Sequence, residues 1–246
     1  MYQPEAVKYR VRPHTFEADD KPATITVERL SRARITEEVG QRVLQTMLLA
    51  YVHQFATVHQ LADAGDIIRH FAPRNKDRVE VQVDRMNHDL KKGSQYWIID
   101  GPGSSYVSMA KVSPSRPKER WTKALHVEAP NAFVNDVVTV PPKQGLGYGT
   151  MVLDAALRYG GRFDSEGPVS LHAYRGNEGV NRWFTSIGFN ETDALVQPMA
   201  FGNSPIEQVF MTTASADHAH NTTLADMQRK LWGELSHGGV MSEHAE

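Results

Sequence analysis

Residues 132–157 decide the fold and read Ala-Phe-Val-Asn-Asp-Val-Val-Thr-Val-Pro-Pro-Lys-Gln-Gly-Leu-Gly-Tyr-Gly-Thr-Met-Val-Leu-Asp-Ala-Ala-Leu. The first nine residues are dense in β-branched side chains and end at Pro141-Pro142, which predicts a strand that stops abruptly. The apolar run from Met151 to Leu157 predicts a helix that ends at Gly160-Gly161. The three glycines of Gly145-Leu-Gly-Tyr-Gly149 therefore lie in a turn between a strand and a helix.

A glycine-rich turn that opens a helix leaves several backbone N–H groups unpaired near the positive end of the helix dipole. Because these glycines carry no side chains, a pyrophosphate can approach the backbone closely. A tight loop that binds nothing is the alternative. Two other nucleotide motifs fit worse, since the dinucleotide fingerprint needs a glycine where Thr150 stands and the P-loop pattern is absent.

Two motifs in this chain resemble those of the GNAT acyltransferase superfamily. The turn resembles the acetyl-CoA-binding motif Q/R-x-x-G-x-G/A, with Gln144, Gly147 and Gly149 at its defined positions. About 30 residues later, the run Asn177-Glu-Gly-Val-Asn-Arg-Trp-Phe-Thr-Ser-Ile-Gly-Phe189 resembles the family's N-x-x-A-x-x-x-Y-x-x-x-G-F helix. It follows a strand-like segment, Val169–Tyr174, as it does in that family. Two motifs in this order are more specific than either alone.

The resemblance implies an α/β fold of the GNAT type, with a mixed, mostly antiparallel sheet of six or seven strands and helices on both faces. By the order of its elements the resemblance extends over residues 23–213, which we expect to form the acetyltransferase domain. Residues 1–22 are polar and are expected to run over the surface as an extended arm. Residues 214–246 hold a polar linker and an amphipathic helix at Thr223–His237, whose apolar face would dock on its own domain or on a second subunit. A homodimer is thus left open.

The remaining elements follow from periodicity and turn signals. Thr36 is expected to cap a helix whose first turn carries Glu37 and Glu38. A further helix is expected within residues 62–92. Strands are expected at 23–30, at 95–100 and 106–112 around a turn at 101–105, and at 193–201 and 207–213.

Composition argues against several functions. The chain carries 27 basic and 29 acidic side chains, so no excess of positive charge indicates nucleic acid or an anionic membrane as a partner. Cysteine is absent, which removes disulfides, thiolate metal sites and a cysteine nucleophile. The eleven histidines form no metal signature, and no metal site is expected. The amino terminus lacks a signal-peptide core and the longest apolar run, Met47–Val52, is too short to span a bilayer, so a cytoplasmic protein is expected.

Acyl transfer to an amine requires a base, a stabilised oxyanion and a leaving thiolate. The resemblance implies that a splayed strand, Val134–Val140, offers backbone groups to the pantetheine arm and the acyl carbonyl. Acidic side chains near the start of that strand are the usual candidates for the base. Asp136 and Glu128 are within reach by sequence, and Asp136 is the favoured one. A carboxylate that only hydrogen-bonds a neighbouring loop is the alternative.

The general acid is where this chain departs from the family. Phe184 stands where the family commonly has the tyrosine proposed to protonate the leaving thiolate, and phenylalanine has no proton to donate. Tyr174 and Tyr148 are substitute donors, with aromatic packing as the alternative for both; Tyr174 is taken as the catalytic one. Asn177 is expected near the cofactor, although it would also suit simple N-capping. The full set of expected cofactor contacts is Val138, Thr139, Val140, Gln144, Gly145, Leu146, Gly147, Tyr148, Gly149, Thr150 and Asn177.

The sequence thus predicts transfer of an acetyl or other short acyl group from acetyl-CoA or a related acyl-CoA to a primary amine. The acceptor, a small molecule or a peptide, is left open because the segments that would bind it carry no motif. A module that binds acyl-CoA without catalysis is the alternative, and Phe184 favours it. A structural or toxin-neutralising partner protein that acts through the C-terminal helix is a third hypothesis.

Overall fold

An eight-stranded mixed sheet forms the centre of the part of the chain that the computed structural model describes, which is residues 5–11, 23–57, 77–114, 132–159, 167–192, 199–201, 204–213, 219 and 221–222. Its strand order is β1-β2-β3-β4-β5-β6-β10-β7, and every neighbouring pair is antiparallel except β5 and β6. The strands are β1 (Ala6–Val11), β2 (Ala23–Arg29), β3 (Gln95–Ile99), β4 (Ser108–Pro114), β5 (Ala132–Thr139), β6 (Val169–Tyr174), β7 (Asn190–Glu191) and β10 (Gln208–Thr213).

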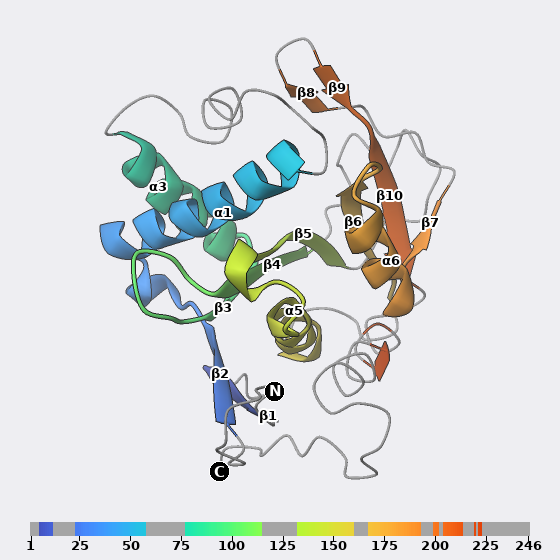
Figure 1. Cartoon of the computed structure of the whole chain (residues 1–246). Coiled ribbons are helices and arrows are strands. Elements are labelled where there is room, and N and C mark those ends of the chain that lie inside the picture. Colours follow the sequence, from blue (N-terminus) through green and yellow to red (C-terminus); the bar gives the residue numbers. More distant parts are fainter. Residues whose placement is uncertain are drawn as a thin grey trace.

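Helices cover both faces of this sheet. Figure 1 shows α1 (Glu37–Thr57) and α3 (Asp77–Lys91) on one side, with α5 (Tyr148–Tyr159) on the other. The short helix α6 (Glu178–Ser186) follows β6 and packs into the same apolar cluster as α5. Two 3-10 turns, η1 (Arg32–Arg34) and η2 (Pro141–Lys143), precede α1 and the glycine turn. None of the helices within the described ranges is long and apolar enough to cross a membrane.

The central strands are apolar on both faces because both faces are covered. In β3, Trp97 and Ile99 belong to the cluster packed around α5, whereas Tyr96 and Ile98 belong to the cluster beneath α1 and α3. This division follows from the alternation of side chains along a strand. The fold class expected from the sequence is therefore confirmed: an α/β protein with a mostly antiparallel sheet between helices. The sheet has eight strands in place of the six or seven expected.

The expected surface arm at the amino terminus is wrong for residues 6–11. These residues form β1, which pairs along its whole length with β2 and adds a strand to the edge of the sheet. Val7 and Tyr9 are buried, and the Tyr9 hydroxyl donates a hydrogen bond of 2.6 Å to Asp154 of α5. The apolar-polar alternation from Val7 to Val11 is the signal for this strand, but the charges around it obscured that pattern. The domain boundaries at 22/23 and 213/214 stay a prediction.

The closing strands are confirmed in part. Residues 208–213 form β10 in the main sheet, as expected. Residues 199–201 form β8 (Met199–Phe201), which pairs only with β9 (Ser204–Ile206) in a separate two-stranded sheet, so this segment does not extend the main one. Residues 193–198, the candidate base Glu128 and the C-terminal helix expected at 223–237 lie outside the described residues.

A β-bulge in β5 reverses the order in which its side chains face the two helical layers. In the pairing with β4, Lys111 lies opposite Asp136 but the next residue, Val112, lies opposite Val134, so Asn135 is the extra residue. Val134 and Val137 consequently both face the α5 cluster, while Val138 faces the cluster under α1. Asp136 is thereby turned toward α1 instead of the apolar layer beneath α5.

Strands β5 and β6 separate at the bulge. Their parallel pairing covers Ala132, Phe133 and Val134 of β5 and ends there, although β5 continues to Thr139 and β6 to Tyr174. The second half of β5 is therefore paired with β4 alone. This opening between two neighbouring strands is the splay that the sequence predicted for Val134–Val140, and it leads directly into the glycine turn.

Candidate functional site

A pocket of about 340 Å³ lies where the splayed end of β5 meets the glycine turn. Four elements line it: the last residues of β5, the turn that opens α5, the first turns of α6 and the C-terminal half of α1. Most of the cofactor contacts predicted from the sequence line this pocket, namely Val138, Thr139, Gln144, Gly145, Gly147, Gly149, Thr150 and Asn177. Two segments 30 residues apart in sequence are thus brought to one cavity.

The backbone of the turn requires glycine. Gly145 and Gly147 have φ angles of 76° and 84°, which side-chain-bearing residues rarely adopt. A Cβ on Gly149 would come within 3.2 Å of the Thr139 hydroxyl, so this glycine permits close packing of α5 against β5. The Gln144 side-chain amide donates to the Thr139 carbonyl oxygen at 3.0 Å, which ties the turn back to the strand. The turn is therefore held open at the start of α5 with its backbone facing the pocket.

The end of β5 is fixed from the β4 side. The Ser108 hydroxyl donates to the Val138 carbonyl oxygen at 3.0 Å and lies 2.9 Å from the Thr139 hydroxyl. The Val140 N–H donates to the Val107 carbonyl at 3.0 Å. These contacts hold the strand against β4 while its opposite edge stays open.

Asn177 has the capping role and also lines the pocket. Its side-chain oxygen accepts a hydrogen bond of 3.3 Å from the Val180 N–H at the start of α6. Asn181 fastens the same helix to the end of β6 by donating to the Tyr174 and Arg175 carbonyls, each at 3.1 Å. The alternative of simple N-capping is therefore confirmed as a role, and it places Asn177 at the cavity wall.

Asp136 lies on the α1 side of β5 next to two phenols. The Tyr51 hydroxyl of α1 donates to the Asp136 carboxylate at 2.9 Å. Burial raises the pKa of Tyr51 well above its usual value, and the Asp136 carboxylate raises it further. Burial likewise raises the pKa of Tyr174, again with the negative charge of Asp136 adding to the effect. Both phenols therefore keep their protons throughout the neutral range.

Neither Asp136 nor Tyr174 is part of the pocket lining, although Val137 beside Asp136 is. The ring of Tyr174 packs edge-on against Phe55 of α1, with ring centroids 5.0 Å apart. The other substitute donor, Tyr148, is half-buried at the start of α5 and packs against the apolar cluster around that helix. Val140, Leu146 and Tyr148 are the three expected cofactor contacts that do not line the cavity.

Phe184 is a core residue. It is buried between Trp183 and Phe189, with ring centroids 4.6 Å and 5.7 Å away. Trp183, and not Phe184, lines the pocket. The position that commonly carries a tyrosine in the GNAT motif is thus used for apolar packing in this chain.

The particular α1 residues at the pocket were not among those predicted from the sequence. Ala50, His53 and Gln54 line the cavity together with Lys143, which adds a positive charge next to the glycine turn. The Lys143 position could have been found from its adjacency to the motif. The α1 residues could not, because their place at the cavity depends on how the helix crosses the sheet.

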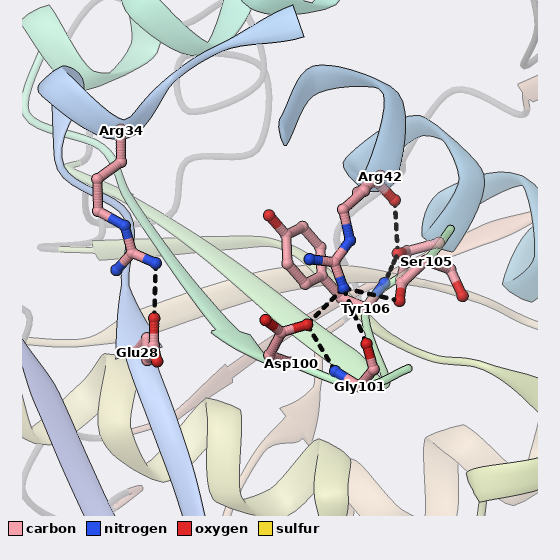
Figure 2. Close-up of polar contacts among 8 residues, drawn as sticks. Glu28, Arg34, Arg42, Asp100, Gly101, Ser105 and Tyr106 are labelled. Atoms are coloured by element: carbon pink, nitrogen blue, oxygen red, sulfur yellow. Dashed lines mark hydrogen bonds and ion pairs between the residues drawn. The ribbon is translucent and has the colours of Figure 1, made fainter. Parts of the chain in front are cut away.

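Arg42 and Thr46 set that crossing, and Figure 2 shows the contacts of Arg42. The Arg42 guanidinium pairs with Asp100, donates to the Gly101 and Ser105 carbonyls at 3.1 Å and 3.3 Å, and lies over the Tyr106 ring. The Thr46 hydroxyl accepts from the Tyr106 N–H at 2.8 Å. The hydrogen bond from Arg42 lowers the pKa of the Asp100 carboxyl. These contacts anchor α1 to the turn between β3 and β4.

His172 of β6 lies between aromatic rings. Its ring is edge-on to Phe133 and Phe210, at centroid distances of 5.2 Å and 5.5 Å, and burial lowers its pKa to about 4. It is therefore neutral at physiological pH and packs as an aromatic side chain. Among the described residues, no group of three or more His, Asp or Glu side chains could hold a metal ion.

Comparisons with known proteins give a likeness in structure alone. No protein-family model matches the chain, and no curated protein sequence matches it. A candidate acetyltransferase from Acinetobacter baylyi superposes with a TM-score of 0.52 at 12% identity, covering 76% of this chain and 91% of that one. A candidate acetyltransferase from Salmonella typhimurium, solved with acetyl-CoA, superposes with a TM-score of 0.50 at 15% identity over 78% and 94% of the two chains. The chain therefore has the fold of the GNAT N-acetyltransferases.

Proposed function

We propose that this protein transfers an acetyl or other short acyl group from acyl-CoA to a primary amine. The observation that carries the proposal is the single pocket that joins the glycine turn to the splayed half of β5. A binding site for a pyrophosphate and a site for a thioester arm are thus continuous. The fold is shared with proteins described as acetyltransferases, one of them solved with acetyl-CoA.

The turn suits the diphosphate of CoA for physical reasons. It opens a 12-residue helix, so unpaired backbone N–H groups and the positive end of the helix dipole meet at its first residues. Gly145 and Gly149 present no side chain to a ligand, and Lys143 at the cavity wall supplies a positive charge. We therefore assign the pyrophosphate to residues 143–150, with Asn177 of α6 on the opposite wall.

The splayed strand suits the pantetheine arm and the acyl group. Beyond Val134, β5 pairs with none of the described residues on its β6 side, so we infer that part of its backbone is available to a ligand that lies along it. Val137, Val138 and Thr139 line the cavity there. We assign the thioester to this opening, where a backbone N–H can stabilise the oxyanion that forms at the carbonyl.

Asp136 is assigned the role of base, acting directly or through a water molecule. The amine nitrogen attacks the thioester carbonyl carbon, the C–S bond breaks, and the proton lost by nitrogen passes to the Asp136 carboxylate. The departing thiolate takes up a proton. The Tyr174 phenol is assigned as its donor because it is protonated at neutral pH and lies within the electrostatic reach of Asp136. Solvent is the competing source of that proton.

A catalytically silent acyl-CoA-binding module is the second candidate. Two observations favour it: Phe184 is packed in the core, and neither Asp136 nor Tyr174 reaches the lining of the pocket. Such a module would use the same turn and the same splayed strand, so binding alone does not separate the two functions.

Release of free thiol from acetyl-CoA separates them. The wild-type protein is incubated with acetyl-CoA and a panel of polyamines, amino acids, peptides and aminoglycosides, and thiol is followed with a chromogenic disulfide. We expect at least one amine to raise thiol release above the amine-free rate, and Asp136→Asn to lower that increment without weakening CoA binding. If no amine raises thiol release while CoA binding is intact, the transferase function is refuted in favour of the silent binding module.

A further inference from the structure

We infer that Tyr51 is a positioning residue, which holds the Asp136 carboxylate in place on the α1 face of β5. The inference rests on the proposed transferase function and deepens it. Its observation is a single contact across 85 residues of sequence, the 2.9 Å hydrogen bond from the Tyr51 hydroxyl to Asp136 Oδ1. The contact assigns to α1 a part in catalysis beyond covering the sheet.

The bulge in β5 makes this contact possible. An uninterrupted strand would place Asp136 on the same face as Val134, in the apolar layer beneath α5. With Asn135 as the extra residue, Asp136 faces α1 and meets Tyr51. Bulges next to active sites often redirect a side chain. This bulge redirects the Asp136 carboxylate from an apolar layer to a phenol.

Tyr51 is itself held on both sides. Its ring stacks on Phe55 one turn later, with centroids 6.1 Å apart, and packs against the cluster beneath α1. N-terminal to Tyr51 the helix is anchored on the turn between β3 and β4 by Thr46 and by Arg42 (Figure 2). A phenol on a helix fixed at both ends presents its hydroxyl at a constant position, and the pKa shift described above keeps that hydroxyl a donor.

One carboxylate oxygen is engaged by Tyr51, and a carboxylate has two. The Tyr51 bond thus fixes the plane of the carboxyl group while the other oxygen can accept a proton from the amine. Loss of the phenol should therefore slow the chemical step and leave acyl-CoA binding unchanged.

Other ionisable groups face this pair and have to be considered in any pH study. Lys111 is opposite Asp136 in the β4 register, but its ammonium group pairs with Asp89 of α3 at 2.5 Å. The charge on Arg85 of α3 also acts on the Tyr51 phenol. The groups around the pair are accordingly Tyr174 from β6, Lys111 from β4, Tyr96 from β3, and Arg85 and Asp89 from α3.

Tyr51→Phe tests the inference, with Tyr9→Phe as its matched control. Tyr9 is also a buried phenol that donates to a carboxylate, at 2.6 Å, but its acceptor is Asp154 of α5. We expect Tyr51→Phe to lower kcat by ~10- to 100-fold, the range for a hydrogen bond to a charged group, with KM for acetyl-CoA unchanged. Tyr9→Phe should change neither kcat nor KM.

A double-mutant cycle with Asp136→Asn shows whether Tyr51 acts through Asp136. We expect Tyr51→Phe to have no further effect on the rate in the Asp136→Asn background. A folded Tyr51→Phe variant with the wild-type kcat, or a full rate loss in both backgrounds, would overturn the inference. The same cycle run on denaturant unfolding of the ligand-free protein needs no activity. If the two substitutions are coupled in the free energy of unfolding but the wild type releases no thiol, the proposed function alone is rejected. If they are not coupled, the contact between Tyr51 and Asp136 is rejected.

Discussion

Gly147 offers the sharpest perturbation of the cofactor turn. Its φ angle is 84°, and it lines the pocket at the start of α5. Any residue with a Cβ at such a φ costs about 1–2 kcal/mol of backbone strain, which lowers the free energy of unfolding. In Gly147→Asp the new carboxylate would in addition face the assigned pyrophosphate. At about 4 Å and an effective dielectric constant of about 20, two like charges repel by about 4 kcal/mol.

That repulsion corresponds to an expected ~10³-fold loss of CoA affinity. Isothermal titration calorimetry is the measurement that checks it. Gly147→Ala carries the strain without the charge and should lose much less affinity. Gly103→Asp is the matched control for folding: Gly103 has a φ of 100° in the turn between β3 and β4, where a Cβ meets no atom within 4 Å. It should share the loss of stability and keep wild-type CoA affinity. Unchanged affinity in a folded Gly147→Asp protein would refute the assignment of the turn.

Three further predictions concern the supports of the site. Asn177→Ala should lower stability by about 1 kcal/mol through loss of the α6 cap, whereas Asn177→Ser should retain the cap, as thermal unfolding will report. Tyr9→Phe should cost about 1–3 kcal/mol in urea unfolding, because it removes a hydrogen bond to the fully buried Asp154. Arg42 lowers the pKa of the Asp100 carboxyl in the folded protein. As the pH falls, Asp100 is therefore protonated in the unfolded chain before it is protonated in the folded one. The pair therefore stabilises the fold above about pH 4 and loses that contribution in more acidic solution, and Arg42→Ala should flatten this part of the stability profile.

The sequence predicted the elements whose signals are local. The strand ending at Pro141-Pro142, the glycine turn and the apolar helix behind it each depend on a few adjacent residues, and all three are confirmed. The capping role of Asn177 also follows from residue type and position. Strand β1 was missed because the short alternation from Val7 to Val11, among charged neighbours, is a weak signal.

The parts that could not be predicted depend on pairing between distant segments. The bulge at Asn135 exists only relative to β4, and without it a two-residue period puts Asp136 on the wrong face. The partner of that carboxylate, Tyr51, appears in the sequence only as one more apolar position on the face of a helix. Which α1 residues line the pocket likewise depends on the anchoring of the helix by Arg42 and Thr46, which have no motif.

A crystal structure of the protein with CoA is the most direct test of the proposed site. We predict the diphosphate against the backbone N–H groups of residues 145–149 and the pantetheine arm along β5 between Val137 and Thr139, with its sulfur directed toward the Asp136 side of the strand. CoA bound elsewhere on the molecule, or a pantetheine arm that runs away from the opening between β5 and β6, would contradict it.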